Sequence, residues 1–492
     1  MSLLQYPNFS LASREPGCVP STSSFNLLLN EDLKSRGFAQ DNLPFDVLSR
    51  IFETYTYSLP PGLPNSNIPW VLGHICRSWR EIALSTRHCW NVFAVIVTDK
   101  NADMVFPMHE ELIRRSGTVL LHISFVFRSP NHSIKEQSPA RILEPALSHS
   151  SRWGTISIIG LNCFGISKQF GRARGRISRL RSLKFVRQHV RQGIGSFLEE
   201  PRGVHFDIFD DAPSLSEVIL SDPIGQLGKH EIYMPWNQLT TYLMHGIVEG
   251  VFLAELERSP NLRVLVRICG SFRPGRTLRP ISHRHLRCLF LHAKAGVQLA
   301  FQQLANVILP SLEILGIALS MARAHREISA IPTIAALVTR SRCQLKTLVI
   351  QQNSKLGIDL LPPLLSQLPS LETLDVGHCE YFRDVFSALC FNPTKPTLLP
   401  NLQRLVVSGG ISTRPNEVKF VKELLDSRQR VFKDGISPGQ LFVPLSYARV
   451  CIKRKIPRYY VFLELEGWER LTVSLTAQSR YLDASTDIST AA

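Results

Sequence analysis

The sequence lacks the segments that would place the chain in or across a membrane. No apolar run approaches the 18 or more residues of a membrane-spanning helix, and NVFAVIV, residues 91–97, is only long enough for a strand. The first sixteen residues have neither a basic start nor a sustained apolar stretch, so we expect no secretory signal. We therefore expect a protein of the cytoplasm, the nucleus or both, without a membrane partner.

Patterned cysteines and known catalytic motifs are also missing. The ten cysteines include no C-x-x-C. Although Cys76 could pair with Cys89, and Cys379 with Cys390, reduced and mostly buried thiols are the expectation for this compartment. The chain contains no G-x-G-x-x-G, P-loop, H-E-x-x-H or G-x-S-x-G.

Two groups of polar residues could in principle carry chemistry. The three carboxylates of DIFDD, residues 207–211, are interpreted as a solvated turn, because no partner residues can be identified for them. His283 and His285 lack further ligands at metal-binding spacing. We predict no catalytic residue, no cofactor and no metal, and we predict that the chain is not an enzyme.

The composition is that of a folded protein with an excess of positive charge. Hydrophobic residues make up 44% and charged residues 20%, while the net charge is +16. Basic residues cluster at 172–191, 258–287 and 453–458. Such clusters favour anionic partners, including nucleic acid, but they also suit the solvated face of a repeat array. Phe185 is the only aromatic residue within 180–191, which argues against binding of stacked single strands.

Residues 41–95 carry the pattern of a small helical module. Asp41 or Asn42 can cap a first helix, with Pro44 in its first turn. One apolar stripe contains Val47, Leu48, Ile51, Phe52 and Tyr55, and a second contains Val71, Leu72, Ile75, Cys76, Trp79, Ile82 and Ala83. A proline-rich loop separates the two stripes. Two or three helices of this size bury little area, so we expect them to pack on the rest of the chain or on a partner.

These residues resemble an F-box. The pattern L-P-x-[DE]-[IVL]-L-x-x-I-F is present as LPFDVLSRIF, and residues 69–86, PWVLGHICRSWREIALST, are similar to the F-box family of basidiomycete fungi. Asp46 replaces the usual glutamate, and the loop between the helices is long. The resemblance implies that the module binds the Skp-type adaptor of a cullin-RING ubiquitin ligase. We expect the adaptor-binding residues to be Leu43, Pro44, Val47, Leu48, Ile51, Phe52, Ile75, Cys76 and Trp79, although some of them must hold the module together instead.

The longer remainder of the chain repeats the pattern L-x-x-L-x-[VIL]. Its first leucines are separated by 35, 47, 24, 26, 33, 26 and 31 residues, which is typical of leucine-rich repeats. The gap of 47 residues is expected to hide a further unit at PWNQLTTYL, residues 235–243. Helical patterns precede several repeats, for example IPTIAALVTRS at 331–341. Because one unit cannot bury its apolar face alone, the repeats should stack into a solenoid.

We predict an α/β protein in which a small all-α F-box precedes an irregular leucine-rich-repeat-like solenoid. Parallel strands should lie inside its curve and helices outside. The expected limits are a mostly disordered segment at 1–40, the F-box at 41–95, the solenoid at 96–475 and a disordered tail at 476–492.

The predicted function is that of a substrate receptor. The resemblance implies that an F-box protein selects a target, while other subunits carry out ubiquitin transfer. We expect the protein target to contact the strand-bearing inner face, and the arginines favour an acidic or phosphorylated target. The alternatives are an interaction scaffold that acts without a cullin, and a basic nucleic-acid-binding protein.

Overall fold

The structure is a computed structural model in which two compact units can be described. It describes residues 43–58, 68–98, 101–128, 137–160, 167–186, 207–222, 233–246, 252–269, 280–293, 297–319, 329–352, 360–377, 387, 389–390, 398–408, 424, 427, 447–451, 462–466 and 470–474. The first unit contains the chain up to Ala94, Glu111–Val119 and the residues from Tyr459 onward. The second contains Val95–Glu110 and Leu120–Arg458. The predictions for residues 1–42, 476–492 and the basic run 453–458 lie outside the described residues.

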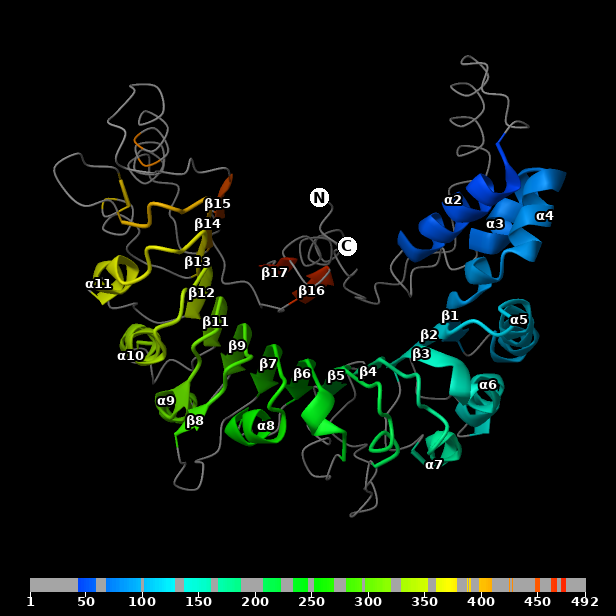
Figure 1. The fold of residues 1–492 in the computed structure, drawn as a ribbon, viewed down its shortest axis with the longest axis horizontal. Helices are drawn as coiled ribbons and strands as arrows, with labels where there is room; N and C mark the ends of the chain where they lie inside the picture. The colour runs from blue at the N-terminus through cyan, green and yellow to red at the C-terminus, as the bar shows by residue number, and fades with distance from the viewer. Residues whose placement is uncertain are drawn as a thin grey trace, which may run out of the picture. The chain divides into compact units, whose positions relative to one another are not determined.

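Short helices form most of the first unit (Figure 1). They are α2 (Phe45–Ser58), α3 (Ile68–Ile75), α4 (Arg77–Ser85) and the 3-10 helix η2 (Arg87–Trp90). Pro44 lies immediately before α2 rather than in its first turn, and its carbonyl accepts hydrogen bonds from the amides of Val47 and Leu48. The residue that precedes the helix is thus Pro44, two or three residues later than the expected caps at Asn42 or Asp41.

One sheet of 13 strands dominates the chain. The strands are hydrogen-bonded in the order β1-β2-β3-β4-β5-β6-β7-β9-β11-β12-β13-β14-β15, and every pair resolved from β2 to β15 is parallel. Their bounds are β1 (Val92–Thr98), β2 (Leu121–Arg128), β3 (Trp153–Ile159), β4 (Ser182–Val186), β5 (Glu217–Asp222), β6 (Thr241–Gly246), β7 (Val264–Cys269), β9 (Cys288–Ala293), β11 (Ile314–Leu319), β12 (Thr347–Gln352), β13 (Thr373–Gly377), β14 (Arg404–Ser408) and β15 (Tyr447–Cys451).

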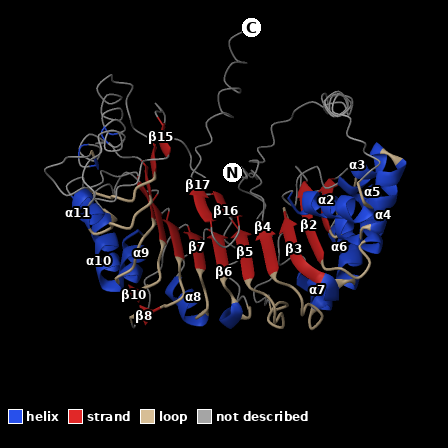
Figure 2. Cartoon of the chain, turned by 45° about the horizontal axis from the view of Figure 1, so that its top comes forward, coloured by secondary structure: helices blue, strands red, loops and turns tan. Residues whose placement is uncertain are grey.

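Helices cover one face of this sheet. Within the second unit, the strands line the inside of the curve and helices α6 to α11 lie outside it (Figures 1 and 2). The helices along the sheet are α5 (Ala102–Arg115), α6 (Gln137–Ser148), α7 (Ser167–Phe170), α8 (Phe252–Arg258), α9 (Val297–Ala305), α10 (Ile331–Ser341) and α11 (Leu361–Ser366), with 3-10 turns η3 (Ser150–Arg152), η4 (Gly171–Ala173) and η6 (Trp236–Gln238). The predicted α/β architecture of a parallel sheet with helices is confirmed. Within the described residues, no helix is long and apolar enough to cross a bilayer.

The repeated leucines form the core of the second unit. The first leucine of every repeat, from Leu180 to Leu402, is 0% exposed. The second position, for example Leu265 or Leu348, lies within a strand and is buried as well. The hidden unit is confirmed, because Leu239 is buried and β6 follows it directly.

A second sequence repeat, which our sequence analysis missed, occurs once in each of the two units. The motif E-x-A-L-S-x4-W occurs at 81–90 and again at 144–153. Each copy ends a helix, and its tryptophan indole donates a hydrogen bond to the alanine carbonyl: Trp90 to Ala83 at 2.6 Å and Trp153 to Ala146 at 3.0 Å. A strand follows each copy. The helix α4 and the residues after it are thus built like the helix-to-strand connection at α6 and β3 in the array.

Two small sheets are not hydrogen-bonded to the 13-stranded sheet. Strands β8 (Ile281–Ser282) and β10 (Val307–Ile308) pair in parallel. Residues 462–474, which were expected to belong to the solenoid, instead form β16 (Phe462–Glu466) and β17 (Arg470–Ser474), which pair antiparallel in a sheet of two strands. Among the described residues, the last strand of the parallel sheet is β15, which ends at Cys451.

Candidate docking surface

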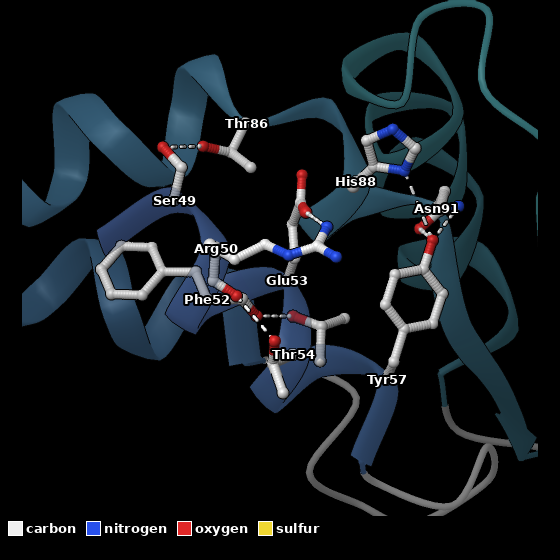
Figure 3. Close-up of polar contacts among 10 residues, drawn as sticks. Ser49, Arg50, Phe52, Glu53, Thr54, Tyr57, Thr86, His88 and Asn91 are labelled. Carbon is white, nitrogen blue, oxygen red and sulfur yellow. Dashed lines mark hydrogen bonds and ion pairs between the residues drawn. The ribbon is translucent and has the colours of Figure 1, made fainter. Parts of the chain in front are cut away.

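Helix α2 is held to the rest of the first unit by one buried stripe and by polar contacts at both ends. Leu48 and Phe52 are 4% and 1% exposed, and the ring of Phe52 lies 4.9 Å from that of Trp79. Thr86 donates to Ser49 at 3.2 Å near the start of α2 (Figure 3). Near its end, the Asn91 amide donates to the Tyr57 hydroxyl at 2.9 Å. These contacts fix which face of α2 remains outside.

The second predicted stripe is divided between two helices, a correction to the single stripe of the sequence pattern. Cys76 has an extended backbone, with φ −153 and ψ 173, and it caps α4. Its sulfur accepts a hydrogen bond from the amide of Trp79 at 3.4 Å. The side chain of Arg80 ties α4 back to α3 by donating to the carbonyl of Gly73 at 2.7 Å. Side-chain capping of an amide that would otherwise be unpaired explains the break.

A residue from far along the sequence completes the first unit. The guanidinium of Arg115 lies 4.4 Å from the ring centroid of Trp70 and 4.5 Å from that of Trp90. The two indoles meet edge to face at 5.0 Å. Arg115 also donates a hydrogen bond to Glu111 at 2.6 Å. The hydrogen bonds that Glu111 accepts from Arg114 and Arg115 lower the pKa of its carboxyl group to about 2. The two tryptophans therefore pack against one arginine of α5 by cation–π contact.

Exposed apolar side chains concentrate in this unit. Among the described residues, eleven large apolar side chains are exposed, and nine of them belong to the helical module. They are Leu43, Phe45, Val47, Ile51, Tyr55, Tyr57, Val71, Ile75 and Leu84; the other two are Tyr233 and Leu360. Isolated exposed apolar residues are ordinary, but a contiguous group marks an interaction surface.

On α2 the exposed residues form a continuous row. Val47, Ile51 and Tyr55 are spaced i, i+4 and i+8, about 100° around the helix from the buried row of Leu48 and Phe52. They line a shallow depression along the helix together with Asp46, Arg50 and Thr54. On α3, Val71 and Ile75 are likewise one turn apart and exposed. We call these five residues the apolar rows.

The structure sorts the nine residues predicted to bind an adaptor. Leu48 and Phe52 belong to the module's own core, and Trp79 is half-buried against Phe52. The remaining six are exposed: Leu43, Pro44, Val47, Ile51, Ile75 and Cys76. Cys76 and Cys89 are both free thiols, and burial raises the pKa of Cys89 to about 12.

Sequence reasoning missed three exposed residues, Phe45, Tyr57 and Leu84, and it assigned Tyr55 and Val71 only to the helix stripes. The repeated motif supplies a signal for Leu84. Its counterpart in the second copy, Leu147, is 2% exposed, whereas Leu84 is 45% exposed. The leucine of the motif is thus buried in the array and exposed to solvent in the helical module.

His283 and Asp207, two of the residues that could have carried chemistry, make contacts within the fold. His283 is buried, with Nδ1 accepting from the amide of Leu286 at 3.1 Å and Nε2 donating to the carbonyl of Ser259 at 2.9 Å. Desolvation lowers the pKa of His283. In DIFDD, Asp207 pairs with Arg174, while Asp210 is exposed. Across the described ranges, no group of three or more His, Cys, Asp or Glu residues could hold a metal ion.

The chain was compared with family models and with curated proteins, and nothing in either set matches it.

Proposed function

We propose that the chain is the substrate-recognition subunit of a Skp–cullin–RING type ubiquitin ligase. Its helical module would act as an F-box that binds the Skp-type adaptor, and its leucine-rich-repeat-like array would hold a protein target. The array would fix the target near the ubiquitin-loaded enzyme, so its contribution to rate is proximity.

The observation that carries the proposal is the pair of apolar rows on a module with an F-box-like sequence. Val47, Ile51 and Ile75 are 42%, 48% and 46% exposed, although their own helices are already packed. A partner helix laid across them would remove this area from water. Stable interfaces of this kind bury roughly 1,600 Å² in total, and a few apolar anchors dominate their energy.

The test is capture of the Skp-type adaptor by the full-length chain. Ile51→Asp places a charge in the middle of the apolar row without touching the core. We expect it to weaken adaptor binding at least about 30-fold, as loss of a central apolar anchor does. Leu360→Asp is the matched control, because Leu360 is 44% exposed in the array and stands just before α11. Unchanged capture by Ile51→Asp, with wild-type helix content, would refute the proposal.

The same purification separates the alternatives. Recovery of the adaptor with a cullin supports a ligase receptor, whereas recovery of the adaptor alone would identify a scaffold. Binding of plain duplex or RNA that falls steeply with salt, without any adaptor, would point to nucleic-acid binding.

A further inference from the structure

We draw no further inference here: the strongest candidate, the inner face of β4, β5 and β6 around the half-buried side chains of Ile219 and Leu243, is a sheet face for which nothing among the described residues shows what covers it.

Discussion

At the scale of single residues, His109 is a titratable group that the fold removes from water. It lies on α5 and is 0% exposed, with Nδ1 3.2 Å from the carbonyl of Ile142 and its ring edge to face with Phe125. Desolvation lowers its pKa from 6.5 to about 4, and the nearby charge of His149 acts in the same direction. The folded state therefore holds this imidazole neutral at pH values where the unfolded chain protonates it.

We predict a loss of stability as pH falls from 7 to 5. Because the folded-state pKa lies below the unfolded value, the unfolded state binds more protons between pH 6.5 and pH 4. For His109 alone the loss is on the order of 2 kcal/mol at pH 5. Urea unfolding of His109→Gln should lack this part of the pH dependence. His74→Gln, at an exposed histidine, should retain it. Equal pH dependence in both variants would contradict the assignment.

At the scale of elements, β9 and β11 pack together because Gly316 on β11 leaves room for the ring of Phe290 on β9. A Cβ atom at Gly316 on β11 would lie well inside contact distance of the Phe290 ring on β9. The register places these two residues opposite each other, and Phe290 is fully buried. Because the ring is enclosed by protein atoms, a methyl group at Gly316 would have to displace it against its neighbours.

Gly316→Ala should therefore destabilise the second unit by about 1–3 kcal/mol, the usual cost of overpacking. Gly171→Ala is the matched control, because nothing lies within 4 Å of its added Cβ, and it should cost less than about 0.5 kcal/mol. Adding Phe290→Val to Gly316→Ala should recover part of the loss, and the non-additivity can be measured in a double-mutant cycle. Full stability of Gly316→Ala alone would rule out this packing.

Sequence patterns at this scale predicted the elements of the array better than those of the module. The spacing of buried leucines located the strands, including β6, because a strand's side chains face the core with a short local period. The break at Cys76 was not predicted, because a stripe of apolar residues continues through it. Whether Leu48 or Ile51 faces inward could not be predicted either, since both belong to one apolar face and only packing against Trp79 distinguishes them.

At the scale of the whole molecule, the first unit is not contiguous in sequence. The chain leaves it after Ala94 and returns for Glu111–Val119. Arg114 and Arg115 both pair with Glu111 at 2.6 Å, but their side chains are 71% and 19% exposed. Only Arg115 contacts the rings of Trp70 and Trp90.

Arg115→Ala should therefore destabilise the first unit by about 1–2 kcal/mol, through lost cation–π contact and lost packing of its stem. Arg114→Ala should leave the stability of the first unit nearly unchanged, as expected for an exposed ion pair. Hydrogen exchange measured by mass spectrometry should rise over α3 and η2 in Arg115→Ala and stay unchanged in β9. Similar exchange in both variants would mean that the tryptophans do not depend on Arg115.

The sequence alone determined the α/β class and the repeat spacing, and it indicated helices before the array, because each depends on local periodicity. Tertiary structure decided which apolar residues stay exposed, which arginine packs between the tryptophans and which basic residues are paired within the fold. The physical reason is that exposure and pairing depend on neighbours that are distant in sequence. Arg172 and Arg181 belong to the same basic run, yet Arg172 pairs with Glu144 on another helix, whereas Arg181 is exposed directly before β4.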